Sequence, residues 1–190
     1  MIDYLLTHTP FNLVAPDLFG HGRSDKWRQP HAYAWEEMVD DVSFLVHSFA
    51  TRRNHLVGHS IGSALTMALV HQLTTTNSHQ LSLGKLVLLG TGHDSPPTAR
   101  SPFLRCCNCF LECIRPALSA KSAASLYHPQ FIETHAEMIA KDRAVSSQNP
   151  FYVIRPLCLR MDWPLQELQR ELTLPTLIIQ VGFSCAESGD

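Results

Sequence analysis

The segment Gly58-His59-Ser60-Ile61-Gly62 contains the residues of this chain best suited to chemistry. It follows a short apolar run and precedes a long helical stretch, so the serine stands at a strand-to-helix turn. Gly-x-Ser-x-Gly in this setting is the sequence form of a nucleophile elbow, which holds a serine hydroxyl clear of a sheet. We expect side chains at Gly58 and Gly62 to collide with the neighbouring strand and helix. Ser60 is therefore the candidate catalytic nucleophile of an acyl-transfer reaction.

The residues beside the serine have expected roles of their own. The backbone N–H of Ile61 would donate one hydrogen bond to the oxyanion of a tetrahedral intermediate. The helix that begins here directs its free N–H groups and positive dipole end toward Ser60, which favours the same charge. We expect the side chain of His59 to point into the fold.

A second segment is rich in glycine. Residues 11–16 form an apolar run, which predicts a buried strand, and Gly20-His21-Gly22 follows shortly after it. Glycines at alternate positions predict a tight irregular turn at the carboxyl end of that strand. We interpret His21 as a loop histidine required by the backbone shape, and we predict no metal site.

Together, VAPDLFGHGRSD at residues 14–25 and LVGHSIG at residues 56–62 resemble the α/β-hydrolase superfamily. The resemblance extends over residues 11–92 and again over 174–182. It implies an α/β fold with a mostly parallel sheet and a helical cap insertion, incomplete at both sheet edges. Serine at the elbow is similar to the esterases, lipases and thioesterases of the superfamily, whereas epoxide hydrolases and haloalkane dehalogenases have aspartate there.

The order of elements agrees with this resemblance, because strands and helices alternate along the core. Such alternation predicts parallel strands joined by right-handed crossovers. A helix is expected over residues 33–46 from the spacing of its apolar residues. Its four carboxylates lie in the first half, which suits a solvated face at the positive end of a helix rather than a metal cluster. The strands are predicted near residues 11–16, 54–58, 85–90 and 175–181.

The chain is expected to form one domain with an insertion. Residues 1–94 are predicted to be the N-terminal part of the hydrolase core. Residues 95–172 begin with prolines and continue with helical segments, which resembles the cap or lid of lipid-hydrolysing members. Residues 173–190 return to the core as a strand and end in an irregular tail.

The acid and the base that Ser60 would need are hard to identify. In the family the acid follows the strand that ends here at Gly182, yet Cys185 stands where aspartate is expected. Asp94 is the alternative acid, since a minority of members place it after the strand that precedes the cap. The family histidine follows a further strand and helix, and none of the 11 histidines has that context. A second oxyanion donor would come from a loop upstream of residue 1. We therefore expect a form truncated at both ends, with low or no activity.

Four of the six cysteines cluster within residues 106–113. Packing as small apolar side chains on a buried helix face is the first interpretation, because cysteine behaves as a small hydrophobe. Palmitoylation is the second, since the cysteines adjoin apolar residues. A zinc site is the third, although adjacent cysteines suit it poorly.

Composition excludes several classes of function. The net charge of −2 predicts no attraction to nucleic acid. No apolar run could span a bilayer, and the N-terminus does not resemble a signal peptide. Six cysteines without a secretory signal indicate reduced thiols, so we expect an intracellular protein, cytoplasmic or peripheral on an organelle membrane. Peripheral membrane contact would involve the cap, and no cofactor is expected.

Two functions from different classes follow. The first is hydrolysis of carboxylic esters through an acyl-enzyme on Ser60, with lipid esters such as acylglycerols or lysophospholipids as substrates. Acyl transfer to an acceptor other than water would use the same serine. The second is a non-catalytic interaction or lipid-binding protein that retains the hydrolase scaffold.

Overall fold

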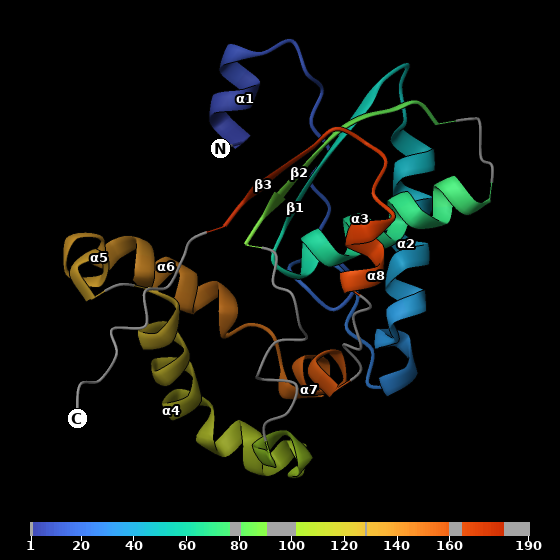
Figure 1. The fold of residues 1–190 in the computed structure, drawn as a ribbon. Coiled ribbons are helices and arrows are strands. Elements are labelled where there is room, and N and C mark those ends of the chain that lie inside the picture. Colours follow the sequence, from blue (N-terminus) through green and yellow to red (C-terminus); the bar gives the residue numbers. More distant parts are fainter. Residues whose placement is uncertain (1, 77–80, 91–101, 128, 160–164, 181–190) are drawn as a thin grey trace, which may run out of the picture. The chain divides into compact units, whose positions relative to one another are not determined.

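The computed structural model describes residues 2–76, 81–90, 102–127, 129–159 and 165–180 (Figure 1). Helices and strands alternate in the first half of the chain, and helices predominate in the second half. In chain order the elements are the helix α1 (Ile2–His8), a 3-10 helix (Pro30–Tyr33), α2 (Trp35–Phe49), β1 (Asn54–His59), α3 (Ile61–Thr75), β2 (Leu83–Leu89), a 3-10 helix (Pro102–Arg105), α4 (Asn108–Leu126), α5 (Pro129–Thr134), α6 (Ala136–Ser146), α7 (Phe151–Leu159), α8 (Leu165–Arg170) and β3 (Thr176–Ile179).

The chain divides into two compact units, each made from two segments. The first unit comprises residues 1–33 and 106–156, and it is helical. The second comprises residues 34–105 and 157–190, and it contains the sheet. The predicted boundaries of the core and cap, at residues 94 and 172, stay predictions.

The sheet has three parallel strands in the order β1-β2-β3. The register places Val57 beside Val87 and Val87 beside Leu177. Three predicted strands are confirmed, and their parallel pairing confirms the expected α/β class. Because parallel strands need crossover connections, helices lie between them in the chain.

The helix α3 is the centre of the sheet unit. It packs against β1, and α2 and α8 both pack against α3 (Figure 1). Every residue from Ser63 to Val70 is buried, as is Leu73. A helix that is apolar on all sides must be enclosed, and its neighbours on three sides provide this. The buried core of the unit therefore lies between α3 and the sheet face that contains Leu86 and Leu88, both fully buried.

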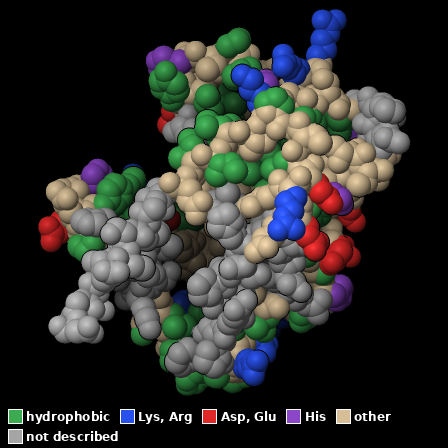
Figure 2. Space-filling view, viewed as in Figure 1, with side chains coloured by type: hydrophobic (Ala, Val, Ile, Leu, Met, Phe, Trp, Pro, Cys, Tyr) green, Lys and Arg blue, Asp and Glu red, His purple; other side chains and the backbone are tan. Residues whose placement is uncertain are grey.

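The opposite face of the sheet is covered poorly by the described residues. Val57 and Leu177 share that face through the register, and their exposed fractions are 49% and 55%. Hydrophobic side chains reach the surface where the strands lie (Figure 2). Parallel sheets in complete α/β folds are covered on both faces, so the described residues form only part of such a fold.

The strand predicted near residues 11–16 is not present. The segment belongs to no helix or strand, and Phe11 and Val14 remain about half exposed. A strand forms only when a neighbour accepts and donates its backbone hydrogen bonds. The described sheet pairs only β1, β2 and β3, so no strand is described beside residues 11–16 with which this segment could pair.

The helical unit is held together partly by a polar junction around Arg115 on α4. Its Nη1 donates to the carbonyl oxygens of Ser147 and Asn149, at 2.7 and 2.9 Å. Its guanidinium also pairs with Glu112 and lies 5.1 Å from the ring centroid of Phe151. Glu112 Oε1 in turn accepts the backbone N–H of Phe151 at 2.7 Å. This junction joins α4 to the start of α7.

The four carboxylates of α2 are exposed, as the sequence predicted, and acidic side chains gather over this helix (Figure 2). They are Glu36, Glu37, Asp40 and Asp41. Mutual repulsion accompanies this clustering, since the pKa of Asp41 is raised by partial burial and then by Glu37 and Asp40.

Among the described helices, none is long and apolar enough to cross a membrane.

Candidate functional site

Ser60 lies between the end of β1 and the start of α3, where the sequence placed an elbow. Its φ is 53° and its ψ is −117°. Among the described residues it is the single non-glycine residue with a positive φ. Such a conformation costs about 1–3 kcal/mol and persists only where its surroundings enforce it. The backbone therefore has the strained turn that a nucleophile elbow requires.

Two backbone hydrogen bonds enforce this conformation. The N–H of Ser60 donates to the carbonyl oxygen of Leu89 at 2.9 Å, which continues the ladder between β1 and β2. The carbonyl oxygen of Ser60 accepts the N–H of Ser63 at 2.9 Å, which begins the first turn of α3. Ser60 is thus bonded to the sheet on one side and to the helix on the other.

The two elbow glycines differ in what surrounds them. A Cβ at Gly58 would lie 2.5 Å from the carbonyl oxygen of Gly62 and 2.6 Å from the Cα of Ser63. The expected collision therefore exists at Gly58. A Cβ at Gly62 would meet no described atom within 4 Å, so the collision expected at Gly62 is wrong. Its side of the turn is open in the part of the chain that the structure describes.

Ser63 is a positioning residue that the sequence analysis missed. Its side chain is fully buried, and its Oγ lies 2.9 Å from the carbonyl oxygen of Gly58 and 3.1 Å from that of Leu89. A hydroxyl has one proton, so the two carbonyls share a single donor. Ser63 therefore ties α3 to the ends of β1 and β2 directly beneath the elbow. A serine three residues after the candidate nucleophile, within an apolar helix, was the available signal.

The hydroxyl of Ser60 is exposed and accessible to a substrate. Its Oγ makes no hydrogen bond with any described residue. Ile61 is the first residue of α3, so its N–H precedes the hydrogen bonds of the helix. The arrangement places an exposed serine beside a helix N-terminus, which is the geometry for stabilising an oxyanion.

The candidate acid Asp94 lies outside the described residues, as does Cys185, which stands where the family has its aspartate. The expectation for His59 is wrong: its side chain is exposed, because strand alternation places it on the same sheet face as Val57. His55 accepts the N–H of Lys85 at 3.1 Å, so its Nδ1 is engaged across the sheet. In the described residues no histidine is hydrogen-bonded to Ser60.

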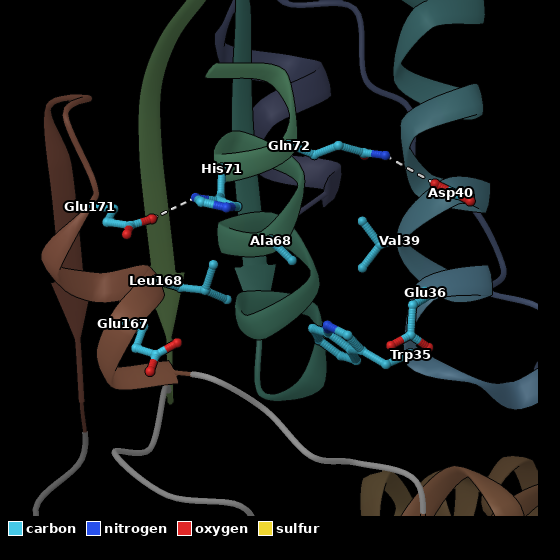
Figure 3. Close-up of a pocket in the computed structure, with 10 residues that line it drawn as sticks. All are labelled: Trp35, Glu36, Val39, Asp40, Ala68, His71, Gln72, Glu167, Leu168 and Glu171. Atoms are coloured by element: carbon cyan, nitrogen blue, oxygen red, sulfur yellow. Dashed lines mark hydrogen bonds and ion pairs between the residues drawn. The ribbon is translucent and has the colours of Figure 1, made fainter. Parts of the chain in front are cut away.

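A cavity of about 480 Å³ lies among α2, α3 and α8, away from the elbow (Figure 3). Ser60 is not one of the residues that line it. Two polar contacts cross it: His71 Nδ1 pairs with Glu171 Oε2 at 2.6 Å, and Gln72 Nε2 donates to Asp40 Oδ1 at 3.0 Å. These contacts join α3 to α8 and to α2. His71 is thus part of the helix packing.

The glycine-rich turn of the helical unit has the predicted irregular shape. Gly20 and Gly22 have φ values of 83° and 49°, which favour glycine. A Cβ at Gly20 would lie 2.6 Å from the ring of Tyr33, and one at Gly22 would strike the carboxylate of Asp17. His21 Nδ1 lies 3.2 Å from the carbonyl oxygen of Phe19, which fits a loop histidine.

The cysteine cluster is not packed as predicted. Cys107, Cys109 and Cys113 are exposed, and Cys106 is half-buried. The first interpretation, a buried apolar helix face, is therefore wrong for most of the cluster. The cysteines occur at the beginning of α4, where three of them lie on the solvent side. Within the described part of the chain, no three His, Cys, Asp or Glu side chains are grouped so that they could hold a metal ion.

Comparison with known proteins gives a consistent result. Residues 3–182 match the profile of the family Hydrolase_4, described as serine aminopeptidase, S33. Protein ABHD8 of Bos taurus is 26% identical over 177 residues, which cover 89% of this chain and 38% of that protein. The chain therefore spans well under half the length of this relative.

Two solved structures are similar to the chain in fold. The enol-lactonase from Burkholderia xenovorans LB400 has a TM-score of 0.65 at 20% identity, covering 86% of this chain and 59% of that one. The esterase from Exiguobacterium antarcticum has a TM-score of 0.61 at 17% identity, covering 85% and 59%. At sequence identities this low, the structural similarity shows a shared fold alone.

The two elbow glycines provide a matched pair of substitutions. We expect Gly58→Ala to lower the free energy of unfolding by about 1–3 kcal/mol, because its Cβ meets backbone that cannot move aside. Gly62→Ala should be neutral or stabilising by up to about 1 kcal/mol, since it adds a helix-favouring residue in open space. Urea denaturation followed by far-UV circular dichroism measures both. Equal losses in the two variants would contradict the described geometry.

Removal of the Ser63 hydroxyl tests the link beneath the elbow. Ser63→Ala should cost about 0.5–1.5 kcal/mol of unfolding free energy, because the buried Gly58 carbonyl and the half-buried Leu89 carbonyl lose their shared donor, while the Leu89 carbonyl keeps its hydrogen bond from the Ser60 N–H. The control is Ser48→Ala, whose hydroxyl donates to Phe44 O on exposed α2 and should change stability by no more than about 0.5 kcal/mol. If both variants lose the same stability in urea denaturation, the buried hydroxyl has no special role.

Proposed function

The chain belongs to the serine aminopeptidase S33 family of α/β-hydrolases, and on this basis we propose that Ser60 is the nucleophile of an acyl-transfer reaction on carboxylic esters. The observation that supports this most strongly is the positive φ of Ser60 between a parallel strand and the buried helix α3. An ordinary strand-to-helix connection does not require a non-glycine residue to adopt this conformation.

In the proposed reaction Ser60 Oγ attacks the ester carbonyl carbon, and a base removes the hydroxyl proton. The carbonyl oxygen becomes an oxyanion, which the N–H of Ile61 stabilises. The intermediate then collapses to an acyl-enzyme: the oxyanion re-forms the carbonyl, the bond from the carbonyl carbon to the alcohol oxygen breaks, and the alcohol leaves with the proton that the base had removed. Water, or another acceptor, then attacks the acyl group and restores Ser60.

Lipid esters, such as acylglycerols or lysophospholipids, are the proposed substrates. Apolar side chains on the helical unit support this choice, since Phe110, Met138 and Val145 are about half exposed on α4 and α6. Such side chains would also serve peripheral contact with a membrane surface. The five described cysteines are unpaired, which supports an intracellular location.

We further propose that the chain of 190 residues alone turns over slowly. The supporting observation is that, among the described residues, no histidine and no carboxylate is hydrogen-bonded to Ser60 Oγ. Asp94 stays the candidate acid. Without a base the serine hydroxyl is a weak nucleophile.

A second function remains compatible with these observations. The same lack of a base among the described residues favours a non-catalytic protein that binds a lipid or a protein partner on the hydrolase scaffold. The two functions differ in what Ser60→Ala does. Binding by a scaffold protein would be unchanged by this substitution, whereas acyl transfer would be abolished.

A fluorophosphonate probe tests the nucleophile directly, because it phosphonylates a nucleophilic serine much faster than an ordinary serine hydroxyl. We expect slow labelling of the folded protein, located at Ser60 by mass spectrometry and lost in Ser60→Ala. Ser48→Ala, which changes an exposed helical serine, should label like the wild type. Complete absence of labelling in protein that circular dichroism shows to be folded would refute the proposed nucleophile for this chain.

Turnover is predicted to be close to background. With p-nitrophenyl butyrate and decanoate as substrates, we expect a small residual rate that Ser60→Ala removes, because the described residues supply one oxyanion donor and no base. Preference for the decanoate would support lipid esters, and an alanine p-nitroanilide tests peptidase activity in parallel. Hydrolysis at ordinary enzyme rates, abolished in Ser60→Ala, would show that a histidine of this chain acts as the base and that the low-activity proposal is wrong.

A further inference from the structure

Two cysteines at the beginning of α4 have sulfur atoms in contact. Cys107 immediately precedes the helix, and Cys109 is its second residue. Their Sγ atoms lie 2.7 Å apart, and both side chains are exposed. Two exposed thiols this close can be joined in a disulfide when a disulfide oxidant takes up their electrons.

The helix terminus defines the chemical character of Cys107. Its carbonyl oxygen accepts the N–H of Leu111 at 3.2 Å, so Cys107 occupies the N-cap position. A side chain at this position can accept hydrogen bonds from the unpaired N–H groups of the first turn, which favours a thiolate. The helix has 19 residues, and the positive end of its dipole also favours a negatively charged thiolate at this position.

The two thiols differ in the direction of their pKa shifts. The pKa of Cys107 is lowered by the hydrogen bond from Cys109 and, next, by the backbone N–H of Phe110. The pKa of Cys109 is raised by the same contact with Cys107. An attacking thiolate beside a thiol that reacts second is the arrangement found in dithiol redox sites.

We propose that Cys107 and Cys109 form a redox-active dithiol that exchanges with low-molecular-weight disulfides such as oxidised glutathione. Cys107 thiolate attacks one glutathione sulfur, the glutathione S–S bond breaks, and one glutathione thiolate leaves. Cys109, after losing its proton, attacks the Cys107 sulfur of the mixed disulfide and expels the second glutathione thiolate. The net change oxidises the two protein thiols to one disulfide and reduces one oxidised glutathione to two molecules of glutathione.

The other cysteines of the helical unit are less suited to this reaction. Cys113 is exposed on the next turn of α4, but its sulfur has no sulfur partner among the described residues. Cys106 is half-buried. The proposal is independent of the acyl-transfer chemistry of Ser60, and its test does not involve ester hydrolysis.

The experiment follows which thiols are oxidised. Reduced protein is freed of reductant, incubated in buffers with set ratios of reduced to oxidised glutathione, quenched in acid and treated with N-ethylmaleimide. Digestion after Arg105, Glu112 and Lys121 separates peptide 106–112, which holds three of the cysteines, from peptide 113–121, which holds Cys113. We expect peptide 106–112 to lose two hydrogen atoms and to retain one alkylated cysteine, with fragmentation locating the disulfide between Cys107 and Cys109.

Matched variants separate the two roles. Cys109→Ser should stop at a glutathione mixed disulfide on Cys107, and Cys107→Ser should form no disulfide in peptide 106–112. Cys113→Ser should behave like the wild type. In Cys109→Ser, limiting iodoacetamide should alkylate Cys107 several-fold faster than Cys113. In urea the ratio of the two alkylation rates and the yield of the Cys107–Cys109 disulfide should both fall several-fold, because the N-terminus of α4 is unfolded.

Several results would overturn the proposal. A disulfide that joins Cys106 or Cys113 instead would do so, as would peptide 106–112 remaining fully reduced in oxidising buffer. Equal alkylation rates for Cys107 and Cys113 in folded protein would remove the role of the helix terminus. Circular dichroism of each variant establishes that it is folded, so a negative result applies to the site itself.

Discussion

The hydrogen bond between the N–H of Ser60 and the carbonyl oxygen of Leu89 is the interaction on which the candidate site depends. It extends the ladder between two parallel strands by one residue, into the turn itself. The backbone must then reverse within a single residue to begin α3, and the positive φ of Ser60 is the consequence. Gly58 permits this reversal because the first turn of the helix passes where its side chain would be. The strain at the serine is therefore a property of the junction between sheet and helix.

The burial of α3 makes that junction rigid. The helix is enclosed by β1, α2 and α8, so it cannot tilt to relieve the strain at its first residue. Ser63 adds a polar link in this otherwise apolar core, since its hydroxyl is shared by carbonyls from the ends of β1 and β2. Polar contacts at the other end of α3, from His71 to Glu171 and from Gln72 to Asp40, join the same three helices (Figure 3). A site that depends on the precise direction of one hydroxyl benefits from this fixed support.

The local sequence pattern correctly predicted those strands and helices whose neighbouring elements are all described. The strands at 54–58, 85–90 and 175–181 are confirmed because each pairs with a neighbour, and helical spacing predicted α2 correctly. The apolar run at 11–16 has an equally strong pattern, but no neighbouring strand is described, and apolar pattern alone cannot supply one. The exposure of side chains was also hard to predict. It depends on which other segments cover a surface, and the pattern of a single sequence does not show this. His59 was expected inside and is exposed for this reason, as are three cysteines of the cluster that had been interpreted as packed. The elbow was predictable because glycine and serine at fixed spacing encode a backbone shape, whereas the acid and base depend on contacts between distant segments.

We propose that Ser60 is a nucleophile and that the N–H of Ile61 receives the oxyanion of the tetrahedral intermediate. The most direct measurement is a crystal structure of the chain after reaction with a fluorophosphonate, in which the phosphonyl oxygen mimics the oxyanion. We expect a covalent bond from Ser60 Oγ to phosphorus, with the phosphonyl oxygen about 2.7–3.1 Å from the Ile61 nitrogen. Phosphorus bound to another side chain, or a phosphonyl oxygen directed away from the N-terminus of α3, would contradict it.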